Sequence, residues 1–210
     1  MIKRLAAVLL ALGAGAAAAG GLESLESFVK TVKTGRAEFT QVVTAPAKQG
    51  QPARSKTSSG SFEFARPHRF KFIYKKPFEQ AIVADGQTLW LYDVDLNQVT
   101  ARQQAQALGS TPAALIASAP DLRALQADFA LASTPERDGL EWVLATPKAK
   151  DSPLQSIAIG LRAGELAALE ILDSFGQKSS LRFSAFVANT PVDAASFQFK
   201  PPPGADVIRQ

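Results

Sequence analysis

Two neighbouring stretches in the first half of the chain alternate between apolar and polar residues. In 61–65, phenylalanines alternate with polar residues, and in 69–75, aromatic residues alternate with arginine and lysine. Alternation with a period of two is typical of a β-strand with one buried face. Arg66-Pro67-His68 lies between the two stretches, and Pro67 favours a turn because it fixes its own φ and donates no hydrogen bond. The pattern therefore predicts a hairpin over 61–77 with one aromatic face and one basic face.

Strand-like patterns continue on both sides of this hairpin. We predict further strands at 36–44, 79–84, 87–93, 97–102, 127–134, 140–146, 154–161, 165–173 and 179–187. Asp85-Gly86 is typical of a two-residue hairpin turn. Short connections favour an antiparallel meander, because parallel strands need crossovers of roughly a dozen residues or more. The strand at 165–173 is predicted although its composition also suits a helix.

Apolar residues at helical spacing predict a small number of helices. One amphipathic helix is predicted over 22–34, ending at Gly35. Its apolar face would consist of Leu22, Leu25, Phe28, Val29 and Val32. Two short helices are predicted within 103–125, because each has a proline at or before its first turn. The stretch 45–56 contains two prolines and three basic residues, and we interpret it as a solvated loop.

These elements amount to about eleven strands and three short helices in a single domain over 20–210. A long antiparallel meander twists and has edge strands to protect, so we expect it to curl. The predicted fold is mainly β, an incomplete and half-open antiparallel β-barrel capped by an α-helical lid. We expect Pro201-Pro202-Pro203-Gly204 to end the regular structure.

The first residues of the chain follow the layout of a secretory signal peptide. Lys3-Arg4 precedes an apolar run over 5–19, and this run ends in small residues with Ala17 and Ala19 in an A-x-A arrangement. The run is shorter than the roughly 20 residues of a membrane span, and no later stretch is long and apolar enough to span one. We therefore expect residues 1–19 to be cleaved near Gly20 and the domain to be exported.

Composition narrows the classes of function. The chain has 210 residues, of which 46% are hydrophobic and none is cysteine. It therefore has no disulfide and no cysteine to carry a lipid of its own. Without the signal peptide, 21 basic residues face 19 acidic ones, a balance too mild to favour nucleic-acid binding.

Side chains for catalysis are scarce. His68 is the only histidine, and it lies in a charged turn that would orient a general base poorly. With one histidine and no cysteine, the usual zinc and transition-metal sites are not expected. The sequence contains no phosphate loop and no GxGxxG motif. We therefore expect neither an enzyme nor a cofactor.

Several short motifs occur together along the chain. They are Arg66-Pro67 with Phe70 and Phe72, Pro77, Asp85-Gly86 with Thr88-Leu89-Trp90 and Tyr92, Thr111-Pro112 with Leu115, Thr146-Pro147-Lys148, and the stretch from Phe197 to Pro202 with Gly204. In this order, through nearly the whole chain after the signal peptide, they resemble the motifs of the LolA family, periplasmic carriers of outer-membrane lipoproteins. The resemblance implies an incomplete barrel with a helical lid over an apolar cavity.

The resemblance also implies roles for individual residues. Arg66 is similar to the family's lid-latching arginine, whose N–H groups would bond to carbonyls of the lid. Without the resemblance, Arg66 would be interpreted as a solvated arginine at a strand end. Phe70 resembles a cavity residue near the mouth, and Phe72 stands where the family often has tryptophan.

We hypothesise that a lid covers an aromatic surface in the empty protein and lifts when lipid enters. The cavity surface would consist of Phe62, Phe64, Phe70, Phe72 and Trp90. The lid would contribute Phe28, Val32, Leu115 and Ile116. Arg66 would hold the empty state closed.

The implied cargo is triacylated outer-membrane lipoproteins, and the implied donor is an inner-membrane ABC-type lipoprotein-releasing complex. Whether an outer-membrane lipoprotein receptor accepts the cargo is left open, and we expect a monomer. One alternative is a lipoprotein-sensing regulatory domain on the same half-barrel. A secreted lipid hydrolase would need catalytic residues that the sequence does not offer.

Overall fold

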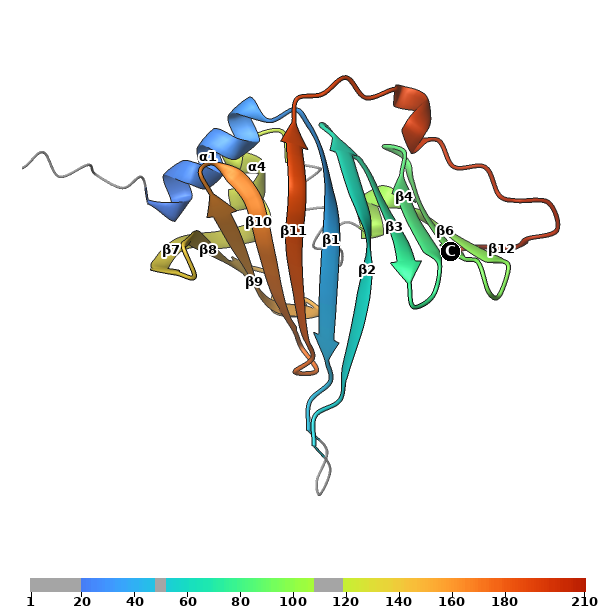
Figure 1. Ribbon diagram of the computed structural model, residues 1–210, viewed down its shortest axis with the longest axis horizontal. Helices are drawn as coiled ribbons and strands as arrows, with labels where there is room; N and C mark the ends of the chain where they lie inside the picture. The colour runs from blue at the N-terminus through green and yellow to red at the C-terminus, as the bar shows by residue number, and fades with distance from the viewer. Residues whose placement is uncertain (1–19, 48–51, 108–118) are drawn as a thin grey trace, which may run out of the picture.

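A single twelve-stranded sheet organises the protein, whose computed structural model describes residues 20–47, 52–107 and 119–210 (Figure 1). In chain order the strands are β1 (Thr34–Thr44), β2 (Ser55–Ala65), β3 (Arg69–Lys76), β4 (Gln80–Ala84), β5 (Thr88–Asp93), β6 (Gln98–Gln103), β7 (Phe129–Arg137), β8 (Leu140–Pro147), β9 (Leu154–Arg162), β10 (Glu165–Asp173), β11 (Lys178–Ala188) and β12 (Asp206–Arg209). The predicted signal peptide and the predicted lid residues Leu115 and Ile116 lie outside the described residues.

The sheet is antiparallel except at one edge, and it does not close. Its strand order is β12-β6-β5-β4-β3-β2-β1-β11-β10-β9-β8-β7, and only the β12–β6 pair is parallel. The sheet curves so that β7 and β12, the two edge strands, lie on opposite sides of the molecule (Figure 1). The predicted half-open antiparallel fold is confirmed, with twelve strands in place of about eleven.

The extra strand corrects the expectation that regular structure ends at the prolines. Gly204 adopts a φ of +75°, and the chain then turns back along β6. The backbone N–H of Asp206 donates to the carbonyl of Asn97, and Val207 lies opposite Val99. A four-residue strand is too short for its alternation to be recognised, which is why the sequence pattern did not predict it.

The start of β2 is a second correction. The strand begins at Ser55, within the stretch interpreted as a loop, and pairs with β1 from Thr44 onward. Residues 55–59 are polar on both faces, so they carry no period-two signal. Backbone pairing with β1 holds them extended. Glu165–Asp173 is a strand as predicted, with Leu166 and Leu169 buried.

The helices are short, and they contact strands in both halves of the sheet. They are α1 (Gly21–Thr31), α2 (Gln104–Ala107), α4 (Leu122–Asp128) and the 3₁₀ helix η2 (Ala194–Phe197). Helix α1 ends at Thr31 and not at Gly35 as predicted, because Val32 is already extended. Gly35 belongs to β1, where a Cβ would lie 2.5 Å from the Phe64 ring. Asp121 caps α4 by accepting from the N–H of Ala124.

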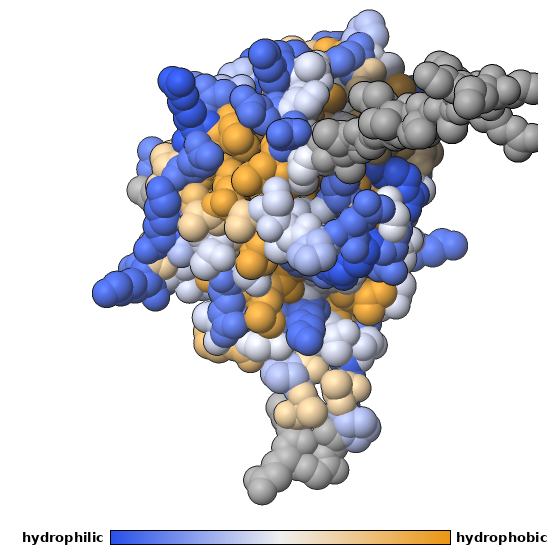
Figure 2. Space-filling model, turned by 90° about the vertical axis from the view of Figure 1, so that its left-hand side faces the viewer, coloured by the Kyte–Doolittle hydropathy of each residue, from blue (hydrophilic) through white to orange (hydrophobic). Residues whose placement is uncertain are grey.

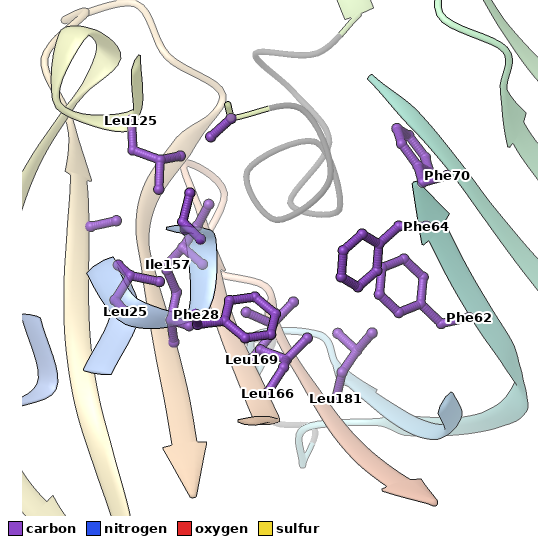
Figure 3. Close-up of a cluster of buried hydrophobic side chains, with 14 of the residues drawn as sticks. Leu25, Phe28, Phe62, Phe64, Phe70, Leu125, Ile157, Leu166, Leu169 and Leu181 are labelled. Carbon is purple, nitrogen blue, oxygen red and sulfur yellow. The ribbon is translucent and has the colours of Figure 1, made fainter. Parts of the chain in front are cut away.

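The main hydrophobic core lies on the concave side of the curved sheet, between the strands and α1 (Figure 3). A smaller cluster on the opposite face contains Leu140, Trp142 and Ala168. On the side formed by β7–β10, apolar residues reach the surface only in small areas between polar ones (Figure 2). Among the described residues, no helix has the length and apolar character needed to cross a membrane.

Candidate functional site

Four phenylalanines of β2 and β3 form one continuous aromatic surface on the concave side. Phe62 lies opposite Phe72 and Phe64 lies opposite Phe70 in the β2–β3 register. The ring centres of Phe62 and Phe72 are 4.4 Å apart, and those of Phe62 and Phe64 are 5.6 Å apart. None of the four is more than 5% exposed. The structure thus brings together four of the five predicted cavity residues, hereafter the aromatic surface.

Trp90 lies on the other face of the sheet. Its neighbours Leu89 and Leu91 pack against the concave core, so the alternation of β5 directs Trp90 outward. The Trp90 ring lies 5.5 Å from Phe199, and its Nε1–H donates to Asp85 at 2.9 Å. The segment after β11 crosses this outer face on its way to β12 (Figure 1). The sequence-based placement of Trp90 beside the phenylalanines is therefore corrected.

Helix α1 lies against the concave side and reaches the aromatic surface through Phe28. The Phe28 ring is 6.3 Å from Phe64, and Leu25 and Val29 of the same helix are buried. In Figure 3, Leu25 lies beside Ile157, and Phe28 lies beside Leu169 and closer to the aromatic surface. Val32 is 6% exposed within the same core. The two predicted lid residues that the structure describes, Phe28 and Val32, thus contact the concave core.

Arg66 ties the β2–β3 turn to two other segments. Its Nε donates to the carbonyl of Val32 and its Nη1 to the carbonyl of Ala119, both at 2.9 Å. Its guanidinium carbon lies 5.4 Å from the Phe28 ring centre and 5.2 Å from that of Phe64. Burial lowers the pKa of Arg66 to about 10, so it stays charged at neutral pH. Nη2 is buried and has no partner among the described residues.

The C-terminal end of α1 is held by a residue that the sequence did not single out. The Asn189 amide donates through Nδ2 to the Thr31 carbonyl at 3.0 Å. Its Oδ1 accepts from the Lys33 N–H at 2.8 Å. Asn189 lies more than 150 residues away along the chain, so no local pattern could have indicated this contact.

The N-terminal end of α1 is held against β7 and β8. The Leu22 N–H donates to the Ser133 hydroxyl at 3.0 Å, and the Ser24 hydroxyl donates to Glu141. Gly21 packs so closely on the backbone of Trp142 that a Cβ there would lie 2.5 Å from the Trp142 carbonyl oxygen. Hydrogen bonds and close packing therefore fix both ends of α1.

A pocket of about 720 Å³ opens at the end of the sheet away from α1. Tyr74 joins it to the aromatic surface, because its ring stacks 6.5 Å from Phe72 while its side chain also lines the pocket. The Tyr74 hydroxyl donates to Gln41 Oε1 at 2.9 Å, and burial raises the pKa of Tyr74 to about 12. Phe78 and Leu96 at the pocket rim are 58% and 70% exposed.

The described residues offer little for metal chemistry. Within 20–47, 52–107 and 119–210, no three His, Cys, Asp or Glu side chains gather to hold a metal ion. His68 is exposed in its turn, with a φ of +69°. What the arrangement offers is apolar contact area and a buried cation that bonds to carbonyls.

Comparison with known proteins supplies the family. The model of the family described as "Outer membrane lipoprotein carrier protein LolA" matches residues 30–200. A protein of Albidiferax ferrireducens named outer-membrane lipoprotein carrier protein is 72% identical, and the match covers 100% of both chains. A protein of the same name from Methylibium petroleiphilum is 54% identical, over 96% of this chain and 95% of the relative.

A solved structure shares the fold. It is the crystal structure of an uncharacterized conserved protein from Thermus thermophilus, which superposes with a TM-score of 0.50. The identity is 14%, and the match covers 90% of this chain and 97% of that one. At this identity the likeness concerns the fold alone.

Proposed function

The chain belongs to the LolA family of outer-membrane lipoprotein carrier proteins, and we propose that it binds the acyl chains of lipoproteins against the aromatic surface. One structural observation carries this proposal: Arg66 bonds the edge of that surface to the segments that follow α1 and precede α4. The protein is a carrier of outer-membrane lipoproteins. Relatives matched over nearly their full length bear the carrier name, which does not favour the alternative of a lipoprotein-sensing domain.

Acyl chains need such a surface because water opposes them strongly. Burying hydrocarbon gains about 0.8 kcal/mol per methylene, so a chain of about fifteen methylenes represents on the order of 12 kcal/mol. A carrier that kept this whole gain would not release its cargo. Some of it must therefore be offset by a cost of opening the empty protein.

Arg66 is suited to set that cost. Hydrogen bonds from a charged donor contribute roughly 1.5–3 kcal/mol each, so the two to Val32 and Ala119 favour the closed state by a few kcal/mol. Nη2, which has no partner among the described residues, lowers this advantage, because an unsatisfied buried donor costs about 1–3 kcal/mol. The closed state is then stable enough to favour release and weak enough to allow entry. We assign Arg66 the role of latch on this basis.

The carrier works in the periplasm. We propose that residues 1–19 direct export and are removed, that triacylated lipoproteins are the cargo, and that an inner-membrane ABC-type complex supplies them. A monomer with one aromatic surface would carry one lipoprotein at a time. An outer-membrane receptor would complete the transfer, and no chemical step is required.

The test is a transfer assay in two stages. Purified protein is incubated with inner-membrane vesicles that contain a triacylated lipoprotein and the releasing complex, and the soluble lipoprotein is then offered to outer membranes. We expect a soluble one-to-one complex with the wild type. Arg66→Leu should still take up lipoprotein but deliver it at least about tenfold more slowly, because the closed empty state loses its two hydrogen bonds.

Arg69→Leu is the matched control, because Arg69 is an exposed arginine at the other end of the same turn. It should deliver lipoprotein at the wild-type rate. Wild-type delivery by Arg66→Leu would remove the latch role. Failure of the wild-type protein to solubilise any lipoprotein would refute the carrier proposal itself.

A further inference from the structure

Gln104, the first residue of α2, is a polar side chain that is almost completely buried. It is 2% exposed, and among the described residues the only other buried polar or charged side chain is Ser24. A primary amide carries two donor hydrogens and one acceptor oxygen, and burying it without partners is costly. Its hydrogen bonds therefore indicate what it holds in place.

Those hydrogen bonds join two neighbouring turns at the rim of the sheet. Nε2 of Gln104 donates to the His68 carbonyl at 2.7 Å, and Oε1 accepts from the Gly86 N–H at 2.9 Å. The backbone N–H of Gln104 donates to Gln87 at 2.8 Å. One side chain thus links the β2–β3 turn, which contains Arg66, to the β4–β5 turn.

The β2–β3 turn needs such support for Arg66 to reach both of its acceptors. The Arg66 N–H is bonded to the Lys33 carbonyl at 2.8 Å, which fixes one side of the turn. The other side passes through His68, whose positive φ is unfavourable for a residue with a side chain. The His68 carbonyl is held by Gln104, two residues beyond Arg66.

We propose that Gln104 is a positioning residue for Arg66, an inference that rests on the proposed carrier function. Two hydrogen bonds of 2.9 Å to carbonyls on separate segments require the guanidinium to stay within about half an ångström of its place. Gln104 restricts the turn to that position. It acts through the backbone of His68 and does not itself touch the lipid.

Gln104→Glu tests this role, because it is designed to keep the contact with the β4–β5 turn and to remove the contact with the β2–β3 turn. In Gln104→Glu, measured at a pH high enough to ionise the buried carboxyl, one oxygen still accepts from the Gly86 N–H, but no hydrogen is left to donate to the His68 carbonyl. Gln104→Met removes both contacts at similar volume and serves as the second variant if the first does not fold. Gln103→Glu is the matched control, because Gln103 is the exposed neighbour on the same segment.

The first measurement is hydrogen exchange at the Arg66 Nε–H in the empty, ¹⁵N-labelled protein. We expect exchange to be about tenfold faster in Gln104→Glu than in the wild type, and unchanged in Gln103→Glu. This readout does not depend on lipoprotein. Unchanged exchange in Gln104→Glu, or in Gln104→Met where the first variant does not fold, would overturn the inference even if the carrier proposal held.

The second measurement is the delivery rate in a double-mutant cycle. Gln104→Glu alone should slow delivery several-fold, and adding it to Arg66→Leu should slow delivery no further. A purely structural role predicts independent effects that multiply, and that result would overturn the positioning role. If the wild type fails to take up lipoprotein, the carrier proposal fails, while the exchange experiment still decides whether Gln104 positions Arg66.

Discussion

The two halves of the concave side are built from different side chains. On β8–β11 the buried residues of this core are aliphatic, and we refer to this part as the aliphatic half; they include Val143, Ile157, Ile159, Leu161, Leu166, Leu169 and Leu181. On β2 and β3 the aromatic surface takes their place. Helix α1 packs mainly on the aliphatic side, against β7, β8 and β9. It meets the aromatic surface through Phe28.

The difference separates a permanent core from a surface that can change partners. Burying Leu25, Phe28 and Val29 contributes about 1.5–3 kcal/mol for each side chain, so the three together contribute more than two Arg66 hydrogen bonds of roughly 1.5–3 kcal/mol each. Because one end of α1 is bonded to strands and the other to Asn189, just after β11, this helix is a poor candidate for a part that lifts. The opening we expect would break the Arg66 bonds to Val32 and Ala119 and leave α1 in place.

The largest expected effect concerns a glycine of the aromatic half. A Cβ at Gly60 would collide with the backbone carbonyl of Ile73 on β3, and a backbone atom cannot rotate away. Gly60→Ala should therefore disturb the β2–β3 pairing and lower the free energy of unfolding by roughly 3 kcal/mol or more. Urea denaturation followed by circular dichroism measures this loss.

Gly160 supplies the matched comparison in β9. A Cβ there would approach only side-chain atoms, at 3.0 Å from the Trp142 ring and 3.1 Å from Leu140. These side chains can shift slightly, so Gly160→Ala should cost only about 1 kcal/mol. Equal losses for the two variants would contradict the close backbone approach in the aromatic half.

The next largest effect is expected when a buried side chain is truncated to alanine in either half. Leu169→Ala and Phe72→Ala should each cost about 3 kcal/mol, because both side chains are buried and the space they leave cannot fully collapse. Thermal unfolding with and without a short-chain phospholipid below its micelle concentration then distinguishes them. The lipid should restore part of the lost stability of Phe72→Ala, because its hydrocarbon chain can fill the vacated space.

Leu169→Ala should be stabilised by the lipid no more than the wild-type protein is, since its vacated space faces the core under α1. The wild-type protein, measured with and without the lipid, shows how much lipid binding alone stabilises the fold. Identical responses of the two truncated variants would mean that the two halves do not differ in their access to hydrocarbon.

The sequence predicts the parts of this arrangement that depend on residues close together in the chain, and it does not predict those that depend on residues far apart. The hairpin and its aromatic face could be predicted, because large apolar residues alternate over a short stretch. The face occupied by Trp90 could not, because Leu89 to Tyr92 are all apolar and the pattern does not say which face is concave. Asn189 and Gln104 were missed because their partners lie on distant segments. A sequence pattern records local periodicity and not such contacts.

Tyr74, where the aromatic surface meets the pocket, makes stability depend on pH. In the unfolded chain its hydroxyl ionises near pH 10, whereas burial raises the pKa to about 12 in the folded protein. The stability that Tyr74 contributes is therefore present below pH 10 and declines between pH 10 and 12, by roughly 2 kcal/mol. Urea unfolding at pH 9 and at pH 11.5 or above measures the decline.

Tyr74→Phe should lose this part of the pH dependence, because phenylalanine does not ionise. At pH 9 the variant should also have a free energy of unfolding about 1 kcal/mol lower than the wild type, because it lacks the hydrogen bond to Gln41. A wild-type and variant decline of the same size would show that Tyr74 keeps contact with water when folded.

The smallest effect tests whether α1 is fixed at its N-terminal end. Ser24→Ala removes the hydrogen bond to Glu141 but improves helix propensity, so the net loss of stability should be about 1 kcal/mol. Ser27→Ala is the control, since Ser27 is exposed on the same helix and should be neutral or slightly stabilising. Lipoprotein delivery should be unchanged in both variants, because α1 stays in place while the Arg66 bonds to Val32 and Ala119 open. Slower or faster delivery by Ser24→Ala alone would mean that α1 itself moves, and α1 would then belong to the lid and not to the permanent core.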